Sequence, residues 1–229
     1  MNRRLPSDDR VAIEHHRGTK HVVFTMPILE ECVLEELVTV FRGGASEDQV
    51  YPLVLRSAHP TVFLAGAHLA EIASHDEASC VPYAELGRKV VTLLRSYPAP
   101  TVAAVCGSCS GGGFDLALAC DIVITWPSAK FDHPGVKRGL VTGWSGTVFL
   151  PGAVGGPLSR AALLTGRAIS GRSLEALGAR CGVDDDPRET ATDTALDLAH
   201  LDSARFQFWR SLRHGRFVDR FRASVLHKL

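Results

Sequence analysis

Residues Pro100–Asp121 read PTVAAVCGSCSGGGFDLALACD, and this order of residue types sets the architecture that we expect for the chain. Thr101–Val105 is apolar and rich in β-branched residues, which predicts a buried strand. Gly107 and Gly111–Gly113 predict a turn in which the backbone can approach a ligand without an intervening Cβ. Phe114–Ala119 is mostly apolar and predicts a buried helix. The segment is therefore expected to be a strand, a glycine-rich turn and a helix.

The helix expected after this turn begins with backbone N–H groups that have no partner inside the helix. The positive end of the helix dipole lies at the same place. Asp115 falls in the first turn and puts a carboxylate beside these N–H groups. The sequence therefore predicts a place that can hold an oxyanion next to a carboxyl group.

The composition is that of an ordinary globular protein. The 229 residues are 45% hydrophobic and 22% charged, with a formal net charge of zero. No nucleic-acid or membrane partner is therefore expected. No apolar run is long enough to span a bilayer, and the N-terminal residues do not resemble a secretory signal. The six cysteines lack the spacing of a disulfide framework, which favours a reducing cytoplasm as the location.

Strand and helix patterns alternate along the chain, which indicates an α/β fold. Further strands are expected at Val11–Glu14, His21–Thr25, Tyr51–Arg56 and Ile122–Thr125. Helices are expected at Ile28–Phe41, His68–Ser74, Tyr83–Ser96, Arg160–Thr165, Ser173–Leu177 and Thr194–Leu226, and a polar loop at Asp76–Ser79. A break at Asp184–Pro187 divides the chain into a core, residues 1–183, and a helical region for oligomerisation or closure of the site, residues 184–229.

Two other kinds of site can be weighed against an oxyanion site. Gly107–Gly111 has the pattern of a nucleophile elbow, with Cys109 as the nucleophile between an apolar strand and a helix. Asp184 with His200 or His214 could supply the acid and base, so a cysteine hydrolase is one alternative function. A metal site is not expected, because the ten histidines show no ligand spacing on a helix.

A second glycine turn, distant in sequence, can complete an oxyanion site with the first. Phe63–Leu69, FLAGAHL, and Ser110–Asp115, SGGGFD, each place small residues at a tight turn before a helix. If the turns face each other, one N–H group from each can point at a single oxygen. Two such donors polarise a thioester carbonyl and stabilise the enolate or tetrahedral anion formed from it. The alternative is that both turns only close strand-to-helix junctions.

Four ordered segments between residues 11 and 183 resemble the crotonase superfamily, the enoyl-CoA hydratase/isomerase family. They are FLAGAHLAEI, PTVAAVCGSCSGGGFDLALACDIVI, AKFDHPGVKRGLVTGWSGTVFLPGAVG and LLTGRAISGRSLEALG. The resemblance implies a β-β-α superhelical core with a short helical C-terminal region, assembled as a homotrimer or hexamer. It also implies acyl-thioester substrates and no cofactor, since coenzyme A or phosphopantetheine arrives as part of the substrate. Fatty acid metabolism is the expected setting.

The resemblance also assigns roles to particular residues. The oxyanion donors of the family fall on the backbone N–H groups of Ala67 and Gly112. Substrate contacts are expected at four neighbouring positions: Ala65, His68, Leu69 and Gly111.

The two catalytic glutamates of the hydratases in this family match the chain differently. The first falls on Asp115, which is a shorter carboxylate. The second falls on Gly135, which cannot transfer a proton. His133 is expected to substitute if its loop turns inward, and Asp132 is the other candidate.

The expected reaction is therefore proton transfer by one base at or near Cα of an acyl thioester, giving isomerisation, hydration or decarboxylation. Asp115 is the expected proton carrier. The loop Met26–Leu29 lacks the features with which many relatives hold the nucleotide of coenzyme A, which favours a thioester carried on a carrier protein. A homologue that binds acyl thioesters without catalysis is the remaining alternative.

Overall fold

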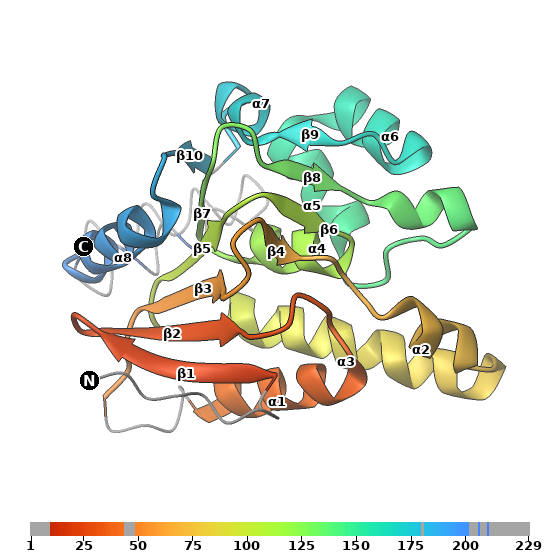
Figure 1. Cartoon of the computed structure of the whole chain (residues 1–229), viewed down its shortest axis with the longest axis horizontal. Helices are drawn as coiled ribbons and strands as arrows, with labels where there is room; N and C mark the ends of the chain where they lie inside the picture. The colour runs from red at the N-terminus through yellow and green to blue at the C-terminus, as the bar shows by residue number, and fades with distance from the viewer. Residues whose placement is uncertain (1–9, 44–48, 180, 202–205, 207–209, 211–229) are drawn as a thin grey trace, which may run out of the picture.

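The computed structural model describes residues 10–43, 49–179 and 181–201, together with Phe206 and Arg210. These residues form two β-sheets surrounded by helices (Figure 1), which confirms the predicted α/β class. The larger sheet has the strand order β1-β2-β3-β5-β7-β10, and only β1 runs antiparallel to its neighbour. Its strands are β1 Val11–His16, β2 Thr19–Phe24, β3 Leu53–Ser57, β5 Thr101–Val105, β7 Ile122–Thr125 and β10 Cys181–Val183.

The smaller sheet has the order β4-β6-β8-β9. Its strands are β4 Val62–Leu64, β6 Ser108–Ser110, β8 Lys130–Asp132 and β9 Ile169–Ser170. From β3 to β8 consecutive strands alternate between the two sheets, so that β3 with β4, β5 with β6, and β7 with β8 each give one strand to each sheet. Helices follow each of these pairs in the chain. The result is a spiral of strand–strand–helix units.

Gly107 makes the bend between β5 and β6 possible. Its φ is +78°, and a Cβ on this residue would come within 1.9 Å of the carbonyl oxygen of Thr61. Only glycine fits such a position. After this bend, Ser108–Ser110 forms strand β6 inside the segment that was expected to be one glycine-rich turn. The sequence pattern missed it because Ser108–Ser110 is short, and its flanking glycines are typical of a turn.

The helices are α1 Glu31–Gly43, α2 Leu69–Ser74, α3 Glu77–Arg95, α4 Gly112–Ala119, α5 Gly146–Val154, α6 Gly156–Thr165, α7 Gly171–Ala176 and α8 Pro187–Ala199, with the 3-10 helix η1 Pro134–Arg138. The expected loop at Asp76–Ser79 was wrong, because Asp76 and Ser79 form a capping box that starts α3. The helix also contains Pro82, although a proline removes one helical hydrogen bond.

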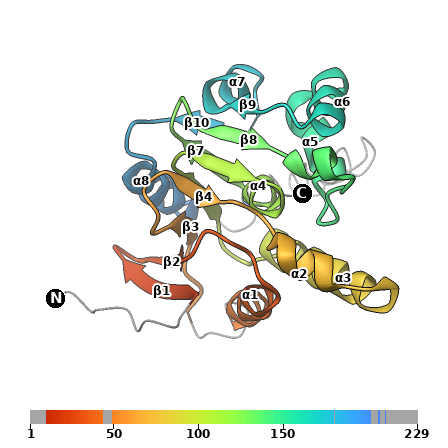
Figure 2. The ribbon, with the colours of Figure 1, turned by 45° about the vertical axis from the view of Figure 1, so that its right-hand side comes forward.

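Apolar side chains of the larger sheet pack on both of its faces. Because successive side chains of a strand alternate, Leu53 and Leu55 face the main core, while Val54 faces α8. The helices α1 and α3 pack against each other on the main-core side, and α8 covers the other side (Figures 1 and 2). No helix within the described ranges is long and apolar enough to cross a membrane.

Helix α8 differs from the helix expected at Thr194–Leu226. It begins at Pro187, where the Asp186 side chain accepts a hydrogen bond from the backbone N–H of Glu189, and it ends at Ala199. A proline in the first turn suits this start, because the missing N–H would have no helical partner there. Most of the expected helix beyond residue 201 lies outside the described residues.

Arg210 is a buried residue that ties the C-terminal part of the chain to the core. Its Nε and Nη2 donate to the two carboxylate oxygens of Asp121, at 3.1 and 2.7 Å. It also donates to the carbonyl oxygens of Ala99 and Tyr97. Asp121 has no exposed surface and accepts from the backbone N–H and the hydroxyl of Thr101. Both charges are therefore paired in the interior, as buried charges must be.

Candidate active site

The two glycine turns paired from the sequence lie against each other in the structure. They follow β4 and β6, which are parallel neighbours in the smaller sheet. A Cβ on Gly66 would lie 2.9 Å from the carbonyl oxygen of Ser110 and 3.4 Å from the backbone nitrogen of Gly112. The absence of that Cβ lets two segments more than forty residues apart meet at backbone contact.

The backbone N–H groups of Ala67 and Gly112 have no hydrogen-bond acceptor among the residues that the structure describes. Leu29 bridges the first turn by donating to the carbonyl of Gly66 at 2.9 Å and accepting from the N–H of His68 at 3.3 Å. In this parallel bridge the N–H of Ala67 points away from Leu29. Gly112 opens α4, so its N–H has no helical acceptor. Across the described parts of the chain, neither N–H donates a hydrogen bond.

The four positions expected to contact substrate lie in the same two turns. The N–H of Ala65 donates to the carbonyl of Pro27, and that of Gly111 donates to the carbonyl of Asp132. His68 caps the start of α2 without a side-chain hydrogen bond to the helix, and Leu69, the first residue of α2, is exposed. Contact of these residues with a substrate remains a prediction.

Asp115 is completely buried in the first turn of α4. Its Oδ2 accepts a hydrogen bond from the hydroxyl of Thr142, while Oδ1 has no hydrogen-bond partner among the described residues. Burial raises the pKa of the Asp115 carboxyl to about 7, and hydrogen bonds from Thr142 and the backbone of Gly146 act in the opposite direction. Asp115 can therefore both accept and donate a proton near neutral pH.

His133 turns inward and faces Asp115. This is the orientation in which it was expected to substitute for the second glutamate. Its Nε2 lies 3.4 Å from Oδ1 of Asp115, and its ring stacks on Phe114 with centroids 5.2 Å apart. Burial lowers the pKa of His133 to about 4, so the ring is neutral at pH 7. Because the ring is neutral at pH 7, its contact with Asp115 is not an ion pair. Asp132 is engaged elsewhere, since its Oδ1 accepts from the hydroxyl of Ser110 at 2.6 Å.

Thr142 and Gly146 complete the surroundings of the carboxyl group, and the sequence analysis assigned neither of them a role. A Cβ on Gly146 would lie 2.2 Å from Oδ1 of Asp115 and 2.9 Å from Nε2 of His133. Only a residue without a side chain leaves room for both groups. The glycine-rich run from Gly139 to Gly146 was the available signal, but it did not show which glycine approaches the carboxyl group.

The structure contradicts the alternative of a cysteine hydrolase. Cys109 lies within strand β6 rather than on an exposed elbow, and it has no exposed surface. Burial, together with the carboxyl groups of Asp132 and Asp115, raises the pKa of its thiol well above the ordinary value. A buried, protonated thiol is a poor nucleophile.

We expect Cys109 to resist alkylation in the folded protein. Iodoacetamide should modify the exposed Cys80 while Cys109 stays unmodified, because the reagent cannot reach a buried thiol and needs the thiolate. Peptide mass mapping after timed exposure would measure both sites. Modification of Cys109 at the rate of Cys80, or a covalent acyl adduct on Cys109, would restore the hydrolase alternative.

Within the ranges that the structure describes, no group of three or more His, Cys, Asp or Glu side chains could hold a metal ion.

Comparison with known proteins finds a matching family model and relatives in sequence. A family model described as enoyl-CoA hydratase/isomerase matches residues 25–204. Mitochondrial methylglutaconyl-CoA hydratase of Mus musculus is 35% identical over 173 residues, which cover 75% of this chain and 55% of the relative. Mitochondrial enoyl-CoA hydratase domain-containing protein 2 of Bos taurus is 40% identical over 167 residues, covering 71% and 56%. The chain thus spans about half the length of these curated relatives.

Solved structures agree with the fold. Enoyl-CoA hydratase from Bacillus anthracis matches with a TM-score of 0.87 and 21% identity, covering 95% of this chain and 89% of that chain. Enoyl-CoA hydratase from Thermoplasma volcanium matches with a TM-score of 0.86 and 24% identity, covering 95% and 90%. At these identities the likeness shows the fold, and it confirms the predicted crotonase architecture.

Proposed function

Because the chain belongs to the enoyl-CoA hydratase/isomerase family, we propose that it moves a proton at the carbon next to the carbonyl of an acyl thioester. The observation that carries this proposal is the buried carboxyl of Asp115, which lies in the same helical turn as the N–H of Gly112 and has its pKa raised to about 7 by burial. A proton carrier and an oxyanion donor therefore share one helix start.

The proposed reaction begins when the thioester oxygen accepts hydrogen bonds from the N–H groups of Ala67 and Gly112. Ionised Asp115 then removes a proton from Cα, and the charge moves onto the oxygen as an enolate. A single donor of this kind is typically worth about 3–4 kcal/mol of transition-state stabilisation. Protonated Asp115 returns the proton to another carbon of the acyl group, which is isomerisation. In decarboxylation no Cα proton is removed, because loss of carbon dioxide from a malonyl-type thioester leaves the enolate directly, and Asp115 that is protonated at the start gives its proton to Cα.

Hydration needs a second proton carrier, because one group activates the water while another protonates Cα. Gly135 cannot take that role. His133, with Nε2 at 3.4 Å from Oδ1 of Asp115, is the titratable group whose position supports it. We therefore place His133 as the candidate partner of Asp115 in any hydratase activity of this chain.

The thioester arm is proposed to be phosphopantetheine, which coenzyme A and acyl carrier proteins share. The composition of Met26–Leu29 favours the carrier-linked form, and equal turnover of both forms would argue against that preference. A homotrimeric or hexameric assembly and a cytoplasmic location remain predictions for this chain.

The test is exchange of Cα protons for deuterium in a panel of unsaturated and malonyl-type thioesters, followed by mass spectrometry between pH 5 and 9. The exchange rate should rise about tenfold per pH unit below 7 and level off above it, because only ionised Asp115 is a base. His133, whose pKa is lowered to about 4 by burial, should add no step in this range. Binding without exchange would identify a non-catalytic homologue, and a rate that falls with pH would exclude Asp115 as the base.

A further inference from the structure

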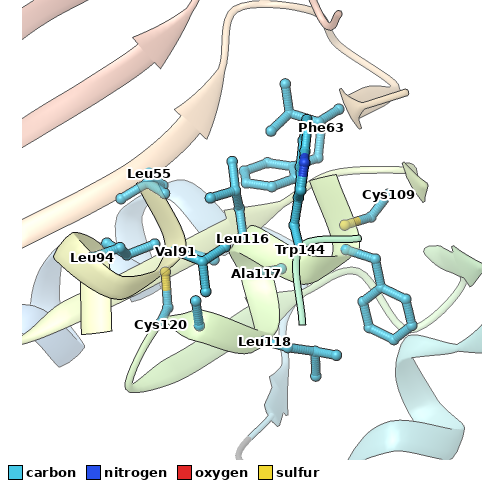
Figure 3. Packing of buried hydrophobic residues seen from close by; sticks show 14 of the residues in the cluster. Leu55, Phe63, Val91, Leu94, Cys109, Leu116, Ala117, Leu118, Cys120 and Trp144 are labelled. Carbon is cyan, nitrogen blue, oxygen red and sulfur yellow. The ribbon is translucent and has the colours of Figure 1, made fainter. Parts of the chain in front are cut away.

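Trp144 is a buried side chain next to the proposed oxyanion site, with 5% of its surface exposed. It precedes α5 and belongs to the cluster of buried hydrophobic residues shown in Figure 3. A Cβ on Gly112 would lie 2.1 Å from Cζ3 of the indole, and a Cβ on Gly87 would lie 2.0 Å from its Nε1. The indole therefore fills a slot between α3 and α4 that exists only because both helices carry glycine there.

The other surroundings of the indole are also occupied. The ring of Tyr83, from α3, lies with its centroid 5.9 Å from that of Trp144. Gly112, which supplies a proposed donor to the thioester oxygen, lies against the six-membered ring of the indole. There is no space for a methyl group between the indole and the Cα of Gly112.

We propose that Trp144 is a specificity-determining residue that restricts the protein to thioesters of short acyl groups. This inference rests on the proposed function, since it takes the thioester oxygen to be held at the N–H of Gly112. An acyl chain that extends from that carbonyl toward the gap between α3 and α4 runs toward the indole. A chain of a few carbons can end before the ring, whereas a longer one can enter only where the indole now packs.

The experiment compares acetyl-, hexanoyl- and dodecanoyl-coenzyme A binding to the full chain by calorimetry. Wild type should bind acetyl-coenzyme A more tightly than the dodecanoyl thioester. Trp144→Ala should bind the dodecanoyl thioester at least about tenfold more tightly than wild type does, the order of discrimination that a hydrophobic pocket gives for one or two methylenes. Its affinity for the acetyl thioester should change little.

Trp126→Ala is the matched control. Trp126 is partly buried, follows β7, and donates through Nε1 to the carbonyl of Asp185. Its loss should leave the ratio of dodecanoyl to acetyl affinity unchanged. Trp144→Leu keeps an apolar side chain of smaller volume and should give an intermediate ratio of dodecanoyl to acetyl affinity. It replaces the alanine variant in the test if that variant does not fold.

The outcomes separate the two proposals. Wild type that binds every chain length with equal affinity, or folded Trp144 variants whose ratio matches wild type, would overturn the role of Trp144 and leave the proposed function standing. Wild type that binds no thioester of any length, whether carried on coenzyme A or on an acyl carrier protein, would overturn the proposed function, and the role of Trp144 with it.

Discussion

Asp115→Asn should lower the rate of Cα proton exchange by a factor on the order of 10²–10⁴, the usual contribution of a positioned acid or base. Asparagine has nearly the shape of aspartate and can keep the hydrogen bond from Thr142, but its amide cannot carry the proton. Thioester binding should persist, because the proposed donors at Ala67 and Gly112 are backbone groups. Deuterium incorporation and calorimetric binding of the same thioester would measure the two properties.

The control for this variant is Asp197→Asn, an identical change at an exposed position of α8. It should exchange Cα protons at the wild-type rate. If Asp115→Asn also exchanged at that rate, Asp115 would have no part in the chemistry. If it lost thioester binding together with exchange while remaining folded, the carboxyl group would act in binding instead of proton transfer.

Arg210→Ala should lower the free energy of unfolding by about 3–5 kcal/mol, the range found when one partner of a buried ion pair is removed. The cause is the carboxylate of Asp121, which would stay buried without its counter-charge. The carbonyl groups of Tyr97 and Ala99 would lose a donor as well. Urea denaturation of the full chain, followed by circular dichroism, would measure the loss.

The matched control is Arg88→Ala, which removes an exposed ion pair with Glu85. Such surface pairs contribute about 0–1 kcal/mol. The double variant Arg210→Ala with Asp121→Asn should lose less than the sum of the two single losses, because the amide carries no charge to compensate. An Arg210→Ala variant as stable as Arg88→Ala would contradict the inference that this buried pair stabilises the fold.

Much of the fold was predictable because its signals are local. The strand Thr101–Val105 and the helix after Gly111–Gly113 follow from runs of apolar residues and from glycines. Strand β6 was not predictable in this way, since three small residues carry no hydrophobic period. The start of α3 was missed for a different reason, because the polar segment Asp76–Ser79 is typical of a loop as well as of a helix cap.

The candidate site, like the fold, was predictable from the sequence only in part. Asp115 and the two turns could be named from the sequence because each lies at a recognisable helix start. The contact of His133 with Asp115 could only be stated as a condition on the η1 loop. Thr142 and Trp144 were missed because their positions depend on how that loop packs over α4, and no periodicity along the chain reports such contacts.

The buried pair of Asp121 and Arg210 has a consequence during protein synthesis. The two residues are separated by 89 positions, and at roughly 5–20 residues per second Arg210 is added about 4–18 s after Asp121. During that interval, packing of the neighbouring strands over Asp121 would bury its carboxylate without a counter-charge. A nascent chain should therefore stay accessible to chaperones and proteases until Arg210 has left the ribosome.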